Sequence, residues 1–405
     1  MTLGKTRLNR FLECSQPSAT YRVIDRIVEK RALGESVISL CAGEPDFDTP
    51  AHISAAAIDA IRSGFTRYTQ VAGFKALRQA VANKFQEDND IPTNWDETIV
   101  CTGGKQVLFN ALAATLNEND EVIIPAPFWV SYPEMVEVCG GKPVTISGEK
   151  QNAFKLTPKA LDKVITPRTK WLILNSPSNP TGAVYSKDEL LSLAKVLRKH
   201  TQVMVLSDDI YEHLIFDGRP FHTMAQVAPD LKNRILTMNG VSKAYAMTGW
   251  RIGFATGPKW LIEAMTKLQG QQTSGACTIS QHAALAALEG PKDFINKSKT
   301  VFLKRRNMAV KMLNEAAGLS CETPSGAFYI FANCSGLLGK TTPGGKFIET
   351  DEDVANALLD EMNVAVVHGS AFGMGPYLRI AYALDDASLK RACERIQTFC
   401  GSLCE

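Results

Sequence analysis

One ten-residue segment holds the side chains of this chain that are best suited to covalent chemistry. The segment reads SKAYAMTGWR and covers residues 242–251. Lys243 carries a primary amine, which attacks aldehydes, and Arg251 follows eight positions later with a guanidinium that can bind a phosphate. A lysine, a run of small residues and this arginine together predict covalent and ionic anchors for one phosphorylated aldehyde.

A glycine-rich turn offers a second place for an anion. Residues 102–106 read TGGKQ, follow an apolar run and precede a helical pattern. Gly103 and Gly104 let the backbone approach an anion closely, and a helix N-terminus supplies free N–H groups and positive partial charge. A tight turn with a helix cap explains the same residues, so the motif alone leaves both interpretations open.

Two further motifs follow apolar runs. Residues 175–182 read NSPSNPTG, a loop whose two prolines fix the backbone and suit a side-chain donor such as Asn179; a structural loop is the alternative. Residues 207–213 read SDDIYEH and hold Asp208, at the edge where open α/β sheets bind ligands. A buried acid there needs a cationic partner, and a protonated pyridine nitrogen would be one. A solvated loop that caps the next helix is the alternative.

The elements that must position these residues are short apolar runs separated by helical patterns. The helical patterns include Gln106–Leu116 and Lys187–Lys199. Apolar strands flanked by helices predict an α/β fold with a mostly parallel sheet covered on both faces. Seven runs are expected as buried strands: Thr98–Cys101, Glu121–Ile124, Pro143–Ile146, Trp171–Leu174, Val203–Leu206, Ile235–Met238 and Ile252–Thr256.

The pattern of apolar and charged residues changes after Gly290-Pro291, which predicts a second, smaller α+β domain. A charged helical stretch is followed by the apolar Ala327–Ala332, a glycine-rich loop at 336–345 and a closing helix from Asp386. A helix at Tyr21–Ala32 is expected to pack with this domain. We therefore predict an N-terminal segment at 1–45, a large domain at 46–295 and a small domain at 296–405.

Composition excludes several classes of protein. The 405 residues include 44 basic and 42 acidic side chains, and this net charge of +2 is spread along the chain, so neither nucleic acid nor a membrane surface is an expected partner. No apolar run is long enough to span a bilayer. The ten scattered cysteines predict free thiols in the cytoplasm and no metal site. Glycine motifs near 339 and 373 lack the pattern that nucleotide binding requires.

Taken together, the motifs resemble the class I aminotransferases of the pyridoxal-phosphate fold-type I superfamily, and within it the bacterial aspartate/prephenate aminotransferase subgroup. The likeness runs from PSAT at 17–20 through AGEPDFD at 42–48 to LRIAY at 378–382. The resemblance implies pyridoxal 5'-phosphate as cofactor, a large and a small domain, amino acids and keto acids as ligands, and a homodimer whose active sites lie at the subunit interface.

The resemblance also implies roles for single residues around the cofactor. Lys243 would bind the aldehyde and move the substrate proton, and Asp208 would pair with the ring nitrogen. Asn179 and Tyr211 match the donors to the ring 3'-oxygen, and Trp129 matches the aromatic residue that stacks on the ring. The phosphate would contact four residues: Gly103, Gly104, Arg251 and, from the second subunit, Tyr68.

Substrate contacts are implied in the same way. Arg379 matches the bidentate clamp on the α-carboxylate, a role that the planar guanidinium fills better than an ammonium. Lys105 matches the lysine that binds the side-chain carboxylate. The implied set is Gly43, Lys105, Trp129, Asn179, Arg379 and Thr20, the last of which joins Lys105 in accepting prephenate.

Three positions and one segment depart from the family pattern. Gly240 replaces a serine that often contacts the phosphate, Asp209 stands where glutamate is commoner, and Gln16 replaces a lysine of some prephenate-active relatives. Gln271–Cys277 holds no arginine that could reach a distal carboxylate. The expected preference for dicarboxylic substrates therefore rests on Lys105.

The expected reaction is a ping-pong transamination of L-aspartate and 2-oxoglutarate to oxaloacetate and L-glutamate, with conversion of prephenate to arogenate as a second activity. Three alternatives stay open at this stage: a pyridoxal-phosphate β-lyase, another amino-acid aminotransferase, and a non-catalytic module that only binds the cofactor.

Overall fold

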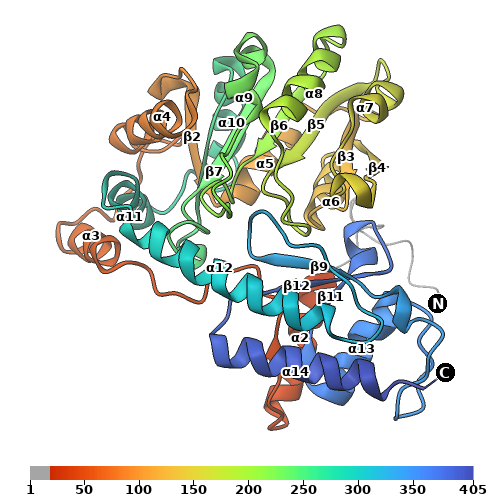
Figure 1. Cartoon of the computed structure of the whole chain (residues 1–405). Helices are drawn as coiled ribbons and strands as arrows, with labels where there is room; N and C mark the ends of the chain where they lie inside the picture. The colour runs from red at the N-terminus through yellow and green to blue at the C-terminus, as the bar shows by residue number, and fades with distance from the viewer. Residues whose placement is uncertain (1–18, 405) are drawn as a thin grey trace, which may run out of the picture.

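A seven-stranded sheet forms the centre of the larger part of the molecule (Figure 1). The computed structural model describes residues 19–404. The strand order is β2-β8-β7-β6-β5-β3-β4, and β8 alone runs opposite to the other six strands, which confirms the predicted mostly parallel sheet. The strands are β2 Thr98–Thr102, β3 Glu121–Ala126, β4 Lys142–Ser147, β5 Thr169–Asn175, β6 Met204–Asp208, β7 Ile235–Gly240 and β8 Ile252–Thr256.

All seven predicted strands exist, but one is not buried. β4 lies at the edge of the sheet beside β3 only, and Lys142, Thr145 and Ser147 are exposed along it. The prediction of a buried strand at Pro143–Ile146 is therefore wrong in its burial. An edge strand has a neighbour on one side only, and its alternating polar residues meet solvent.

Helices cover both faces of this sheet, as the apolar strands require. Strand residues alternate between the two faces, so that Leu172 packs on one side and Trp171 on the other. One face is covered by α5 Gly104–Ala113, α6 Ser131–Val138 and α10 Lys259–Gly270. The other is covered by α3 Ala51–Arg62, α4 Lys75–Asn89, α7 Pro158–Val164, α8 Lys187–Lys199, α9 Met224–Val227 and α11 Thr278–Glu289.

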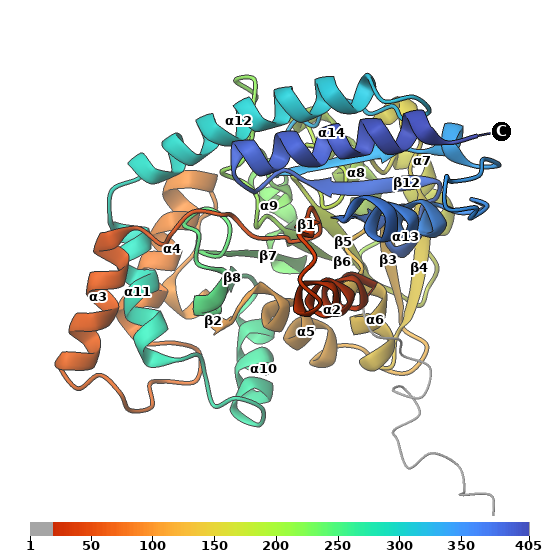
Figure 2. The same cartoon turned by 90° about the horizontal axis from the view of Figure 1, so that it is seen from below.

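The smaller part has an antiparallel sheet in the order β11-β12-β9 and its own apolar core. Its strands are β9 Tyr329–Asn333, β11 Val367–His368 and β12 Tyr377–Ala381, and its helices are α12 Asp293–Asn314, α13 Asp351–Met362 and α14 Asp386–Ser402. Figures 1 and 2 show α12 and α14 side by side along this sheet. Of these, α12, β9 and α14 match the charged helical stretch, the apolar run and the closing helix expected after residue 290, whereas α13, β11 and β12 were not predicted.

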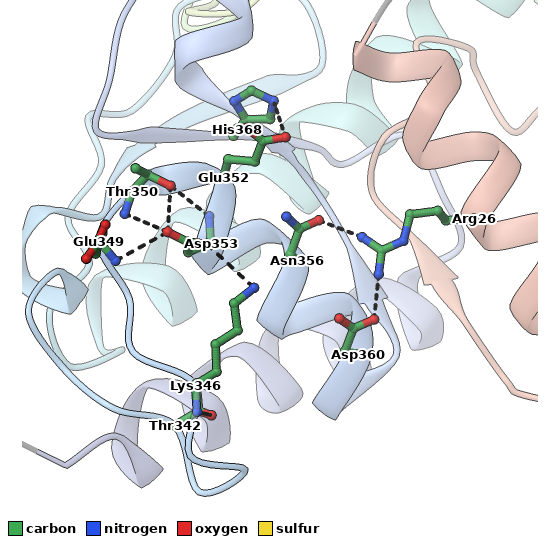
Figure 3. A network of polar contacts seen from close by, with 10 residues as sticks. All are labelled: Arg26, Thr342, Lys346, Glu349, Thr350, Glu352, Asp353, Asn356, Asp360 and His368. Atoms are coloured by element: carbon green, nitrogen blue, oxygen red, sulfur yellow. Dashed lines mark hydrogen bonds and ion pairs between the residues drawn. The ribbon is translucent and has the colours of Figure 1, made fainter.

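The described N-terminal segment packs on the smaller part. Helix α2 spans Ala19–Ala32, and β1 Ile38–Ser39 pairs in parallel with β10 Val364–Ala365. Figure 3 shows how α2 is fastened to α13: Arg26 donates to Asn356 Oδ1 at 2.5 Å and to Asp360 Oδ1 at 2.6 Å. The domain boundaries at 45 and 295 stay a prediction, because α12 begins at Asp293 and runs continuously past the second of them.

Within residues 19–404, no helix combines the length and the apolar character that a membrane span needs. The nine cysteines of this part of the chain are free thiols, as their scattered positions predict.

Candidate active site

A cavity of about 360 Å³ lies where the carboxyl ends of β5 and β6 meet the smaller part of the molecule. Its volume is in the range of small-molecule binding sites. Segments far apart in the sequence supply its walls, from Gly43 to Arg379. Of the predicted site residues, it brings together Gly43, Gly104, Lys105, Trp129, Asn179, Asp208, Tyr211, Lys243, Arg251 and Arg379.

Lys243 stands in the loop that follows β7, with its amine directed at the N-terminal segment. Its Nζ donates to the backbone carbonyl of Gly43. Burial lowers the pKa of Lys243 to about 8, and Arg251 and Arg379 push the pKa in the same direction while Glu44 opposes them. The amine is therefore much nearer to its neutral, nucleophilic form at physiological pH than an ordinary lysine is.

Asp208 is the last residue of β6 and is buried beside the cavity. Tyr132 donates to its Oδ2 at 2.6 Å, and the backbone N–H of Ile210 donates to its Oδ1 at 3.4 Å. Burial raises the pKa of Asp208 to about 6, against the opposite effects of Tyr132, Ile210 and Lys243. No Lys, Arg or His of the described chain forms an ion pair with it, so a cationic ligand in the cavity would relieve its desolvation.

Arg379 lies in β12 and is only 3% exposed. Its guanidinium donates to Asn179 Oδ1 at 3.1 Å and to the carbonyl of Cys41 at 2.6 Å. Within residues 19–404 no carboxylate lies within ion-pair distance of it, and its Nε has no hydrogen-bond partner. A buried cation without a counter-charge is costly, and an anionic ligand would remove this cost.

The glycine turn and Arg251 lie against each other. Gly103 has a φ of +81°, and a Cβ on it would lie 2.4 Å from Nη2 of Arg251. A Cβ on Gly104 would lie 2.9 Å from the sulfur of Met238. Because α5 begins at Gly104, its first-turn N–H groups lie beside this guanidinium. The combination suits a phosphate.

Lys105 and Trp129 form another contact in the wall. The Lys105 ammonium lies 4.8 Å from the centroid of the Trp129 ring. Burial lowers the pKa of Lys105, and the nearby Arg251 lowers it further. Trp129 in turn meets the ring of Tyr132 edge to face at 5.4 Å. A cation is thus held next to an aromatic face that can stack on a planar ligand.

Two predicted residues, Gly103 and Tyr68, do not line the cavity, and the side chain of a third, Thr20, is not described. Gly103 lies against the guanidinium of Arg251. Tyr68 is 91% exposed and lines another hollow together with residues 273–279. Thr20 belongs to the first turn of α2, and its side chain is outside the described part of the structure. Gln16 also lies outside the described residues. The site of this chain alone therefore includes no contact from Tyr68.

The structure shows the local surroundings of two departures from the family pattern, Gly240 and Asp209. A Cβ on Gly240 would lie 3.0 Å from the carbonyl oxygen of Ile252 and 3.2 Å from Gly253 Cα, so a serine would crowd the β7–β8 pair. Asp209 is buried and accepts from Ser207 Oγ at 2.7 Å, and it is absent from the cavity wall. Burial raises the pKa of Asp209 to about 8.

Sequence reasoning assigned no role to three residues of the site. The hydroxyl of Tyr132 donates a hydrogen bond to Asp208, and the hydroxyls of Tyr329 and Tyr211 form a hydrogen bond of 2.8 Å. The side chain of Asn175 accepts from the backbone N–H of Asn179 and donates to the backbone carbonyl of Asp208. Asn175 begins the motif at 175–182 and Tyr132 lies three residues after Trp129, so both stand close to residues that the sequence had already singled out. Nothing in the sequence singled out Tyr329, because it lies in an apolar strand of the smaller part, away from every recognised motif.

Outside the cavity, Asp88, Glu212 and His213 place potential metal ligands within 4.8 Å of one another. The ammonium of Lys84 forms an ion pair with Glu212 and lies 3.9 Å from Asp88. This lysine supplies the positive charge that the cluster needs.

A family model for class I and II aminotransferases matches residues 35–396 of the chain. The chain belongs to this family. It is similar to a probable aspartate/prephenate aminotransferase of Rhizobium leguminosarum bv. phaseoli, with 57% identity over 96% of this chain and 97% of that protein. The aspartate/prephenate aminotransferase of Cereibacter sphaeroides is 54% identical over 96% of this chain and 97% of its own length.

Solved aminotransferase structures share the fold. The aspartate aminotransferase from Rhizobium meliloti matches with a TM-score of 0.96 and 49% identity, covering 99% of this chain and 100% of that one. The Thermus thermophilus aspartate aminotransferase with maleate matches with a TM-score of 0.91 and 40% identity, covering 98% and 100%. This aminotransferase therefore has the fold and the activity class that its motifs predict.

Proposed function

We propose that this aminotransferase uses pyridoxal 5'-phosphate to transfer the amino group between L-aspartate and 2-oxoglutarate. One observation carries the proposal. Lys243, Asp208 and Arg379, which come from three distant segments, line a single cavity. Relatives that are 54–57% identical are named aspartate/prephenate aminotransferases, which supports the choice of substrates.

The side chains around the cavity fit this cofactor. Lys243 offers an amine with a lowered pKa to the aldehyde, and Asp208 offers a buried acid without a cationic partner to the ring nitrogen. Arg251 and the turn at Gly103-Gly104 would hold the phosphate. When bound, the cofactor withdraws electrons from the substrate Cα. Trp129, Asn179 and Tyr211 would complete its contacts.

The residues of the chain then have separate tasks. Arg379 would bind the α-carboxylate through two parallel N–H donors, which fixes how the Cα–H bond is oriented. The amine of Lys243 would take the proton from Cα of the amino-acid substrate, and in the reverse half-reaction it would give a proton to Cα of the keto-acid substrate. The backbone around Gly43 lies within reach of this amine and would contact the substrate nearby.

The second carboxylate of the substrate would be bound by Lys105. Its ammonium is held over Trp129 at the cavity wall, and no acidic side chain within residues 19–404 forms an ion pair with it. Prephenate also carries a second carboxylate, so the same lysine supports transamination of prephenate to arogenate as a second activity. Thr20 would take part in that activity, whereas Gln16 departs from some prephenate-active relatives.

Two copies of the chain would complete each site. Tyr68 is 91% exposed, and the apolar side chains of Ile58, Ile61 and Phe65 are exposed near it in the sequence. Large apolar side chains that are exposed in this number are typical of an interface between subunits. In a homodimer, Tyr68 of each subunit would reach the phosphate in the other.

Two measurements on the purified protein test the proposal. Incubation with pyridoxal phosphate should give a coloured protein, and borohydride should fix the adduct on Lys243, as located by mass spectrometry. Aspartate and 2-oxoglutarate should then yield oxaloacetate and glutamate. Pyruvate and ammonia from an amino acid with a thiolate leaving group on Cβ, such as cystathionine, would instead indicate a β-lyase, and bound cofactor without any turnover would indicate a binding module. A protein that stays colourless and carries no adduct on Lys243 would refute the proposal.

A further inference from the structure

Tyr329 connects two groups of the cavity whose proposed tasks are different. It is the first residue of β9 in the smaller part of the molecule, its ring is 1% exposed, and it lines the cavity. Its hydroxyl lies 2.8 Å from the hydroxyl of Tyr211. Its ring lies 4.8 Å from the guanidinium carbon of Arg379. One side chain thus touches both a proposed cofactor contact and the proposed substrate clamp.

The ring of Tyr329 helps to fix the plane of the Arg379 guanidinium. A second ring, that of Phe372, lies 4.9 Å from the same carbon. With aromatic rings against it and Nη1 and Nη2 bonded to Asn179 and Cys41, the guanidinium has little freedom to rotate. Desolvated cation–π contacts of this kind are worth more than exposed ones.

The hydroxyl of Tyr329 has a separate effect. Burial raises the pKa of Tyr211 and of Tyr329, so both phenols stay protonated at neutral pH and share a neutral hydrogen bond. When Tyr211 donates its own proton to a ligand, its oxygen can accept from Tyr329, and this strengthens the outgoing bond. A Cβ on Gly43 would lie 2.8 Å from the Tyr329 oxygen, so the glycine leaves room for this hydroxyl.

We propose that Tyr329 is a positioning residue of the transamination, whose ring holds Arg379 ready for the substrate carboxylate and whose hydroxyl holds Tyr211 as a donor to the cofactor. The inference rests on the proposed function and deepens it. The two halves of the side chain act on different partners, so they predict different defects.

The variant Tyr329→Phe keeps the ring and removes the hydroxyl. The colour change of the bound cofactor with pH should move its midpoint upward by about 0.4 to 1 pH unit, the equivalent of one weakened hydrogen bond. The Kd of maleate, an unreactive dicarboxylate, should stay within about twofold. The variant Tyr329→Leu removes the ring and should raise the maleate Kd by roughly tenfold to thirtyfold. Absorbance titrations measure both quantities without turnover.

Tyr382→Phe is the matched control. Tyr382 is also fully buried in the smaller part, and its hydroxyl donates to the carbonyl of Ala327 at 3.1 Å, but it does not line the cavity. This variant should lose thermal stability without moving the colour midpoint. In a Tyr211→Phe background, Tyr329→Phe should cause no further shift of the midpoint, because the hydroxyl pair is already broken.

An unchanged colour midpoint in Tyr329→Phe, or a maleate Kd in a folded Tyr329→Leu within twofold of the natural protein, would overturn the inference. If the leucine variant does not fold, the phenylalanine variant and the Tyr211→Phe background decide. A natural protein that takes up no cofactor refutes the proposed function instead. A natural protein that is coloured and active beside unaffected variants refutes only the role of Tyr329.

Discussion

Replacing Lys105 by methionine should separate dicarboxylic from monocarboxylic substrates. In the natural chain the Lys105 ammonium lies 4.8 Å from the centroid of the Trp129 ring. Methionine would keep an apolar contact with this ring and would remove the charge. A hydrogen bond between an ammonium and a carboxylate contributes about 1.5–3 kcal/mol. Lys105 is exposed to solvent, so screening places its contribution near the lower bound. This value corresponds to a loss of roughly tenfold in kcat/KM for aspartate and glutamate.

The assay compares kcat/KM for four substrates with purified, cofactor-saturated enzyme. Aspartate, glutamate and prephenate should each lose roughly tenfold, and alanine should stay within about twofold. Lys75→Met is the control, because the Lys75 ammonium also lies over an aromatic ring, 5.1 Å from the centroid of Trp95, but outside the cavity. Equal losses for alanine and aspartate would refute the assignment of Lys105 to the distal carboxylate. A loss with aspartate but not with prephenate would remove only the second activity.

Three other perturbations test the site and its support. Gly103→Ala should weaken cofactor binding at least tenfold by equilibrium titration, because φ is +81° there and a Cβ would lie 2.4 Å from a guanidinium nitrogen. In cofactor-free protein, the rate at which Lys243 reacts with acetic anhydride should rise with pH and reach half its maximum near pH 8, because the amine reacts only when unprotonated. Glu44→Gln should lower this midpoint, because it removes a negative charge that favours the protonated amine. A midpoint near pH 10.5 would contradict the argument that burial lowers the pKa of Lys243. Asp46→Asn should lower the free energy of unfolding by about 2 kcal/mol, as measured by urea denaturation. Asp46 accepts two hydrogen bonds of 2.7 and 2.9 Å from Arg305, but its side chain is 25% exposed, so the loss stays below the roughly 3–5 kcal/mol of a fully buried pair. An unchanged urea midpoint would show that the pair contributes nothing to stability.

The sequence predicts the large sheet well for a physical reason. Its central strands are covered on both faces, so each is a short, continuous apolar run that stands out from the amphipathic helices. The error at β4 has the same origin: whether a strand is central or at an edge depends on pairing between distant segments, which composition does not record. Residues at strand ends, such as Asp208 and Asn175, could be placed at one edge by the same logic.

One part of the site that sequence reasoning missed, the pair of Tyr211 and Tyr329, depends on a contact across the two parts of the molecule. Tyr211 and Tyr329 are 118 residues apart, and Arg379 and Cys41 are 338 apart. No periodicity links such positions, so only the folded chain brings them together. Lys243 and Arg251 stood out within their own segment, whereas Arg379 entered only through the family resemblance, because an arginine in a strand carries no local signal of its partner.

The segment from Cys41 to Thr49 explains how these distant groups keep a common geometry. It has almost no regular structure, yet its carbonyl at Cys41 accepts from Arg379 and its carbonyl at Gly43 accepts from Lys243. Farther on, Thr49 donates to the carbonyl of Ala246 and accepts from the indole N–H of Trp250. One segment thus bonds both Arg379, the proposed substrate clamp, and the loop that carries Lys243, the proposed reactive amine. Since two of these contacts use backbone carbonyls, many side chains in the segment could vary without disturbing them, whereas a change in backbone path would displace the clamp and the amine together.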